Sequence, residues 1–303
     1  VQPPSVEEAA KLKEGSLLIG FLAPHQSDEL IKVLQQRRVT ALAMELVPRI
    51  SRAQSIDALS SQANIAGYKA VLMAANLSPR LFPMLTTAAG TIRPAKVVVI
   101  GAGVAGLQAI ATARRLGAIV EAYDVRSATK EQCESLGARF IETGVTAEGA
   151  GGYARELTEE EKAQQARVLA NHIAEADAVI STAAVPGRPA PKIIDTATVK
   201  RMKRGAVIVD LAAETGGNCE LTRPGATVEH NGVLIHGPRN VPSTAAVHAS
   251  EMYARNLYNL LTLLIKDGQL TLDFDDEVIR DSCLTHAGEI RHEPTRQRLQ
   301  GEN

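Results

Sequence analysis

An α/β fold with doubly wound, mostly parallel sheets is the fold class that this sequence predicts, and three observations support it. Short apolar runs alternate with helical patterns along most of the 303 residues. The run at 96–100 leads into the glycine pattern GAGVAG at 101–106 and then into a helical pattern. The run at 207–209 is apolar at every position, which is typical of a strand buried on both faces of a parallel sheet.

The first part of the chain predicts a small α/β layer. Helices are expected at 6–13 and 27–37, and strands at 16–22 and 39–45. Because two strands are too few for an independent sheet, this layer needs partner strands from elsewhere in the chain. A long helical pattern at 55–75 leaves the layer and is expected to connect it to the glycine-turn unit.

After Pro94 the alternation continues into the last third of the chain. Further helices are expected at 104–116, 130–136, 196–202 and 245–265, and strands at 96–100, 118–123, 140–141, 178–182, 206–211 and 233–235. The last helix is expected to return to the small layer, and the polar tail at 289–303 to fray. The glycine-rich loop at 144–152 fits a mobile lid and a plain connector equally well.

These elements group into two Rossmann-like domains. Residues 1–54 and 250–303 are expected to form a partial outer α/β domain, and residues 55–249 a nucleotide-binding domain with its connecting helix. The ligand is expected in the cleft, at the carboxyl ends of the parallel strands. The chain begins Val-Gln-Pro-Pro without an initiator Met, which suggests a processed or truncated product.

The glycine turn predicts a dinucleotide site. Gly101 allows the tight turn, Gly103 lets the backbone approach a pyrophosphate, and Gly106 lets the helix pack close to the strand. The phosphates would meet backbone N–H groups at the helix N-terminus. Asp124 lies about 20 residues further on, where a carboxylate binds the adenosine ribose and favours NAD over NADP. Arg126 weakens that preference, since a nearby arginine can accept the 2′-phosphate.

A glycine pattern of this kind can also be a plain turn before a packed helix, but here the strand, the helix and the acid occur together. Other function classes have little support. A net charge of −1 and 3% aromatic residues argue against nucleic-acid binding. The seven histidines are scattered without metal-ligand spacing, so no metal site is expected. Neither a G-x-S-x-G elbow nor a P-loop occurs in the sequence, and no acid/base set is evident.

Composition and apolar runs place the chain in the cytosol. The three cysteines are far apart and are expected to be reduced thiols of an intracellular protein. The sequence has no apolar run of the ~18 residues that a membrane span needs, and its start does not resemble a signal peptide.

A polar cluster at 48–57 lies at the expected junction of the two domains. It is dense in hydrogen-bond donors and acceptors, which suits a binding role at the mouth of the cleft. The alternative is a solvated loop in which Ser51 or Ser55 caps the following helix.

Residues 44–68, which contain this cluster, closely resemble the NAD(H)-binding component, domain I, of proton-translocating nicotinamide nucleotide transhydrogenases. The similarity extends over almost the whole chain, and the loop at 49–57 is highly specific to that family. Further matching segments are 87–90, 101–111, 185–191, 209–212, 216–219 and 273–276.

The resemblance implies direct hydride transfer from NADH to NADP bound on a separate domain, coupled to proton movement through a membrane domain. Such a reaction needs positioning and no general base, which accounts for the missing acid/base set. The implied partners are the NADP-binding domain, the membrane proton-channel domain and a second copy in a homodimer. The implied location is peripheral, on the cytoplasmic face of the inner membrane.

The resemblance also implies the site residues. Arg49, Gln54 and Asp57 would act at the nicotinamide end, with Gln54 bridging toward NADP. Ala184 stands where the family commonly has Leu. The full set of implied nucleotide contacts is Arg49, Ile50, Ser51, Gln54, Ser55, Ile56, Asp57, Ser60, Gly101, Gly103, Val104, Ala105, Gly106, Asp124, Val125, Arg126, Gly152, Tyr153, Gln165 and Ala184.

Two other functions remain open. Alanine dehydrogenases share the fold and resemble residues 16–24, but they carry a catalytic His where Phe21 stands and lack the loop at 49–57. Phe21 therefore argues against amino-acid oxidation. The second alternative is a non-catalytic NAD-binding module. The family's first domain has further strands ahead of the position of Val1, so the N-terminal domain is expected to be incomplete.

Overall fold

The computed structural model describes residues 2–145, 155–185 and 187–301 and divides into two compact units. Unit 1 comprises Val1–Gln62 and Ala246–Asn303, and unit 2 comprises Ala63–Ala245. No helix in the described residues is both long enough and apolar enough to span a membrane.

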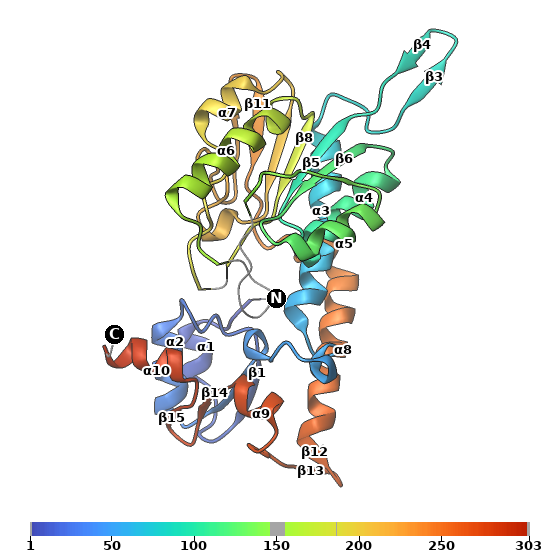
Figure 1. The fold of residues 1–303 in the computed structure, drawn as a ribbon. Coiled ribbons are helices and arrows are strands. Elements are labelled where there is room, and N and C mark those ends of the chain that lie inside the picture. The colour runs from blue at the N-terminus through green and yellow to red at the C-terminus, as the bar shows by residue number, and fades with distance from the viewer. Residues whose placement is uncertain (1, 146–154, 186, 302–303) are drawn as a thin grey trace. The chain divides into compact units, whose positions relative to one another are not determined.

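Unit 2 is built on a seven-stranded sheet with the order β10-β11-β9-β8-β5-β6-β7 (Figure 1). Every pairing is parallel except that of β10 with β11. This order is that of a doubly wound dinucleotide-binding sheet with one added antiparallel edge strand, so the predicted fold class is confirmed. The strands are β5 (Lys96–Ile100), β6 (Ile119–Tyr123), β7 (Arg139–Phe140), β8 (Ala178–Ser181), β9 (Val207–Asp210), β10 (Thr227–His230) and β11 (Val233–His236).

Helices cover both faces of this sheet (Figure 1). Val97 and Val99 of β5 pack in one core with α3 (Ala58–Leu77) and α4 (Val104–Arg115). Val98 and Ile100 pack in the opposite core with α6 (Glu159–Ala174) and α7 (Thr196–Arg201). Successive strand residues point to opposite faces, so a run of apolar residues is what a strand between two helix layers requires. A further helix, α5 (Lys130–Ser135), precedes β7.

Unit 1 contains a four-stranded sheet with the order β1-β2-β14-β15. The two strands expected near the N-terminus, β1 (Leu17–Gly20) and β2 (Thr40–Ala43), pair in parallel. The partner strands that they need come from the C-terminal segment, where β14 (Cys283–His286) pairs antiparallel with both β2 and β15 (Glu289–Ile290). The helices of this unit are α1 (Val6–Ala10), α2 (Asp28–Gln36), α8 (Ala246–Leu264), α9 (Glu277–Ser282) and α10 (Glu293–Gln300).

The expectation that the tail at 289–303 frays is wrong, because residues 293–300 form α10. Arg298 holds this helix to the loop after β1, donating from Nη2 to the Pro24 carbonyl at 2.8 Å and from Nη1 to the His25 carbonyl at 2.6 Å. Arg298 also pairs with Asp28 at 2.7 Å. The helix has little apolar surface and is anchored by long-range polar contacts, so hydrophobic periodicity gave no signal for it.

A hairpin in unit 2 was also not expected. Strands β3 (Leu85–Thr87) and β4 (Gly90–Ile92) pair antiparallel, and all of their residues are exposed. The hairpin projects away from the seven-stranded sheet (Figure 1). A shorter hairpin, β12 (Ile265–Lys266) with β13 (Gln269–Leu270), follows α8.

Candidate functional site

The glycine turn lies where the strand order of the large sheet reverses. Strand β5 lies between β6 and β8, and Ile100 is in register with both Tyr123 and Ser181. The three strands therefore end in line, and their carboxyl-end loops lie next to one another. Thr182, just after β8, donates from Oγ1 to the Gly101 carbonyl at 3.0 Å. Dinucleotides bind doubly wound sheets at this topological position.

Each of the three glycines has a distinct steric reason. Gly101 has a φ of +91°, and a Cβ there would lie 2.6 Å from Thr182 Oγ1. A Cβ on Gly106 would lie 1.8 Å from the Gly101 carbonyl oxygen. A Cβ on Gly103, in contrast, would meet no atom of the described chain within 4 Å. The first two glycines are needed for packing, and Gly103 leaves an open space beside the backbone.

That open space lies at the N-terminus of α4. Gly103 is the N-cap residue, and it has no side chain with which to cap the helix. The first N–H groups of a helix have no intrahelical partner, so those of Val104, Ala105 and Gly106 are donors for an anion. The geometry fits a pyrophosphate, as the sequence predicts.

A fourth close-packed glycine has a role that the sequence analysis missed. A Cβ on Gly67 in α3 would lie 2.0 Å from the Ala105 carbonyl oxygen, so this glycine lets α3 approach the first turn of α4. A glycine inside a helical pattern was the signal that could have revealed it.

Asp124 is placed where a ribose carboxylate is expected, but its oxygens are already engaged. Oδ2 accepts the Ala102 N–H at 2.7 Å and Arg126 Nη2 at 2.7 Å. Oδ1 accepts the Arg126 N–H at 2.9 Å and Arg126 Nε at 2.8 Å. A carboxylate accepts about four hydrogen bonds, so ribose hydroxyls can bind fully only when the Arg126 guanidinium moves. The sequence suggested Arg126 as a neighbour of the site, and the structure makes it a direct partner of Asp124.

Gln165 and Val125 lie behind Asp124. Gln165 is a buried residue of α6 whose side chain hydrogen-bonds the Tyr123 phenol. Burial raises the pKa of Tyr123 to about 12, so the phenol stays protonated. Val125 is half-buried against the same core. Gly152 and Tyr153, which the sequence also assigned to the nucleotide, lie outside the described residues.

Ala184 lies in the loop that follows β8 and is exposed there. The residue that holds this loop is Asn218, which the sequence analysis did not single out. Its Nδ2 donates to the carbonyls of Ala183 at 2.7 Å and Pro191 at 3.0 Å, and its Oδ1 accepts the Ala183 N–H at 3.1 Å. Asn218 is fully buried, so these bonds satisfy it and fix the loop.

The loop at 49–57 belongs to unit 1. Ile50, Ala53 and Ile56 pack into the core formed by α8 and α9. Arg49, Ser51, Gln54 and Ser55 are exposed on the same segment. The apolar residues thus anchor a turn whose polar side chains reach solvent.

Asp57 ends this loop and caps α3. Its Oδ1 accepts the Ser60 N–H at 2.9 Å, and its Oδ2 accepts the Ser60 hydroxyl at 2.6 Å. The suggestion that Ser51 or Ser55 caps the helix is therefore wrong, because the chain reaches the helix only at Asp57. Within the described residues, Asp57 and Ser60 form a unit that fixes where the loop meets the helix.

Family models match nearly the whole chain. The model for the N-terminal domain of the alanine dehydrogenase/PNT family matches residues 1–66, and the model for its C-terminal domain matches residues 70–293. The chain belongs to the alanine dehydrogenase/PNT family.

Within the alanine dehydrogenase/PNT family, transhydrogenases share high identity with the chain. It is 51% identical over 292 residues to the first segment of the NAD(P) transhydrogenase subunit alpha of Rhodospirillum rubrum, covering 94% of this chain and 76% of that one. A transhydrogenase structure from Sinorhizobium meliloti is 47% identical with a TM-score of 0.86, over 95% of this chain and 79% of that chain. The alanine dehydrogenase of Bacillus subtilis is 27% identical over 302 residues, 97% of this chain and 74% of that one. The resemblance found in the sequence is confirmed.

Proposed function

We propose that this chain is the NAD(H)-binding component of a proton-translocating transhydrogenase. It passes hydride directly between its own NAD(H) and NADP(H) held by a separate domain. The observation that supports this most is the open backbone at Gly103, under the N-terminus of α4 and at the switch point of the sheet. Half identity to a transhydrogenase subunit selects this function among those of dinucleotide-binding folds.

The residues of unit 2 fit the nucleotide. The N–H groups of Val104, Ala105 and Gly106 would hold the pyrophosphate, and Asp124 the adenosine ribose after Arg126 moves aside. The bound nicotinamide supplies the hydride donor or acceptor carbon. Arg49, Gln54 and Asp57 would act at the nicotinamide end by orienting the rings. Positioning of this kind supplies catalysis without a general base.

The partners that we propose are an NADP-binding domain, a membrane proton-channel domain and a second copy of this chain. The chain itself would be peripheral on the cytoplasmic face of the membrane. Support for the homodimer comes from the hairpin β3–β4, which exposes 43% of Leu85 and 47% of Ile92. A two-stranded hairpin is marginal alone in water, and a second copy would cover these side chains. Sedimentation of the chain at micromolar concentration measures this directly.

An assay with two substrates separates this function from its alternatives. NADH is oxidised by an NADP analogue only when an NADP-binding transhydrogenase domain is added, and L-alanine does not reduce NAD. Reduction of NAD by L-alanine alone would identify an alanine dehydrogenase. Tight NADH binding without transfer in the presence of the partner domain would identify a non-catalytic module.

Replacing Arg126 with alanine is expected to sharpen the preference for NADH. The guanidinium balances the charge of Asp124, so its loss leaves the carboxylate to repel a 2′-phosphate. The ratio of the NADPH to the NADH dissociation constant should rise about tenfold, the effect of roughly 1.4 kcal/mol. Fluorescence titration with both nucleotides gives the ratio. An unchanged ratio would show that the pair does not set specificity.

A further inference from the structure

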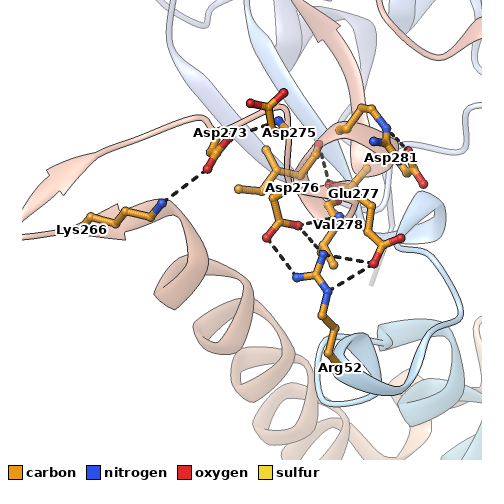
Figure 2. A network of polar contacts seen from close by, with 11 residues as sticks. Arg52, Lys266, Asp273, Asp275, Asp276, Glu277, Val278 and Asp281 are labelled. Carbon is orange, nitrogen blue, oxygen red and sulfur yellow. Dashed lines mark hydrogen bonds and ion pairs between the residues drawn. The ribbon is translucent and has the colours of Figure 1, made fainter.

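An ion pair in unit 1 ties the loop at 49–57 to the N-terminus of α9. Arg52 donates from Nη1 to Asp276 Oδ2 at 3.0 Å and from Nη2 to Asp276 Oδ1 at 2.7 Å. Its Nε and Nη2 also lie 3.4 Å from Glu277 Oε1. Figure 2 shows the guanidinium facing both carboxylates. The two-point geometry of an arginine with a carboxylate fixes direction as well as distance.

The Asp276 end of this pair is itself fixed. Asp276 is the N-cap of α9, and its Oδ1 accepts the Val278 N–H at 2.8 Å. Val278 and Ile279 anchor α9 in the core. The hydrogen bond from Arg52 lowers the pKa of Asp276, so the carboxylate stays charged at neutral pH. A single exposed ion pair contributes little to stability, but one attached to a capped and buried helix can fix the position of a loop.

The loop is held on its other side by α8. Asn256 and Asn259 donate from Nδ2 to the Ser55 carbonyl at 2.9 Å and 3.0 Å. The Ser61 hydroxyl donates to Asn256 Oδ1 at 2.7 Å. Gln54 therefore lies between two anchored positions, Arg52 and Ser55, while its own side chain is exposed.

We infer that Arg52 and Asp276 are positioning residues for hydride transfer. They hold the loop in the conformation that presents Gln54, and neither is required for NADH to bind. The inference rests on the proposed function, in which Gln54 orients the nicotinamides. A displacement of about 1 Å in such a group can lower the rate up to ~100-fold.

The test uses the full chain with NADH, an NADP analogue and an NADP-binding transhydrogenase domain. Arg52→Ala, Arg52→Lys and Asp276→Asn are compared with the wild type in single-turnover transfer and in NADH titration. Lys266→Ala is the matched control, because it breaks the neighbouring ion pair with Asp273 at 3.6 Å (Figure 2) without touching the loop.

We expect Arg52→Ala to lower the transfer rate about tenfold while the NADH dissociation constant changes less than twofold. Arg52→Lys keeps the charge but loses the two-point geometry, so it should lie closer to Arg52→Ala than to the wild type. The double variant Arg52→Ala with Asp276→Asn should be no slower than Arg52→Ala alone, since both remove one interaction. Lys266→Ala should transfer at the wild-type rate.

The inference is overturned when the wild type transfers hydride and both Arg52 variants transfer within twofold of it. It is also overturned when the rate and NADH affinity fall together, because that indicates general distortion. If Arg52→Ala does not fold, the rate and affinity of Arg52→Lys decide between these outcomes. A wild type that binds NADH but transfers nothing refutes the proposed function instead, so the two failures are distinguishable.

Discussion

Gly106→Ala is expected to destabilise unit 2 and to abolish most NADH binding. The new Cβ would lie 1.8 Å from the Gly101 carbonyl oxygen, which is backbone and cannot rotate away. Overpacking of this severity costs about 3 kcal/mol, which lowers Tm by roughly 6–12 °C for a unit of this size. The helix must move away from the glycine turn, so the N–H groups that would hold the pyrophosphate are displaced. We expect at least about tenfold weaker NADH binding.

Gly103→Ala is the matched comparison for this variant. Its Cβ meets nothing within 4 Å in the described chain, so Tm should stay near the wild-type value. The methyl group would nevertheless fill the space where the pyrophosphate approaches, and NADH binding should weaken. Thermal melts and fluorescence titrations separate the two effects. If Gly103→Ala binds NADH as the wild type does, the nucleotide does not use this turn.

Gln54→Ala is expected to lower hydride transfer by about 100-fold while leaving NADH affinity within twofold of the wild type. The side chain is exposed, so its loss should change stability by less than about 0.5 kcal/mol. Its amide offers both donors and an acceptor, which suits a group that orients two nucleotides at once. Single-turnover transfer and NADH titration measure the two quantities on the same protein.

Gln54→Asn refines this test, because it keeps the amide and shortens the reach by one methylene. A transfer rate between those of the wild type and Gln54→Ala would support orientation by the amide. Loss of NADH affinity in proportion to the loss of rate would show that Gln54 only helps NADH to bind.

The nucleotide-binding half of the fold could be predicted because its signals are local. Strand β5, the glycine turn and α4 follow one another within twenty residues, and each has its own periodicity or steric requirement. The parallel strands were found from continuous apolar runs, since they are buried on both faces. Asp124 was located by its spacing from the turn, although its bonds to Arg126 depend on side-chain conformations that spacing does not determine.

The features that escaped prediction depend on contacts between distant segments. Arg52 and Asp276 are 224 residues apart, and neither lies in a pattern that indicates the other. Helix α10 is held by Arg298 to carbonyls more than 270 residues away, so its polar sequence suggested a frayed end. Asn218 is buried by the fold around it, whereas an asparagine after a glycine pair in sequence suggests only a turn.

Direct transfer of hydride between two nucleotides is the central claim, and isotopic labelling tests it most directly. NADH deuterated at the transferred C4 position is mixed with the chain, an NADP-binding transhydrogenase domain and NADP in ordinary water, and the NADPH formed is examined by mass spectrometry. The account predicts one deuterium in each NADPH produced, because the hydride never meets solvent or a protein base. NADPH that carries hydrogen from water, or no NADPH at all while NADH binds, would contradict it.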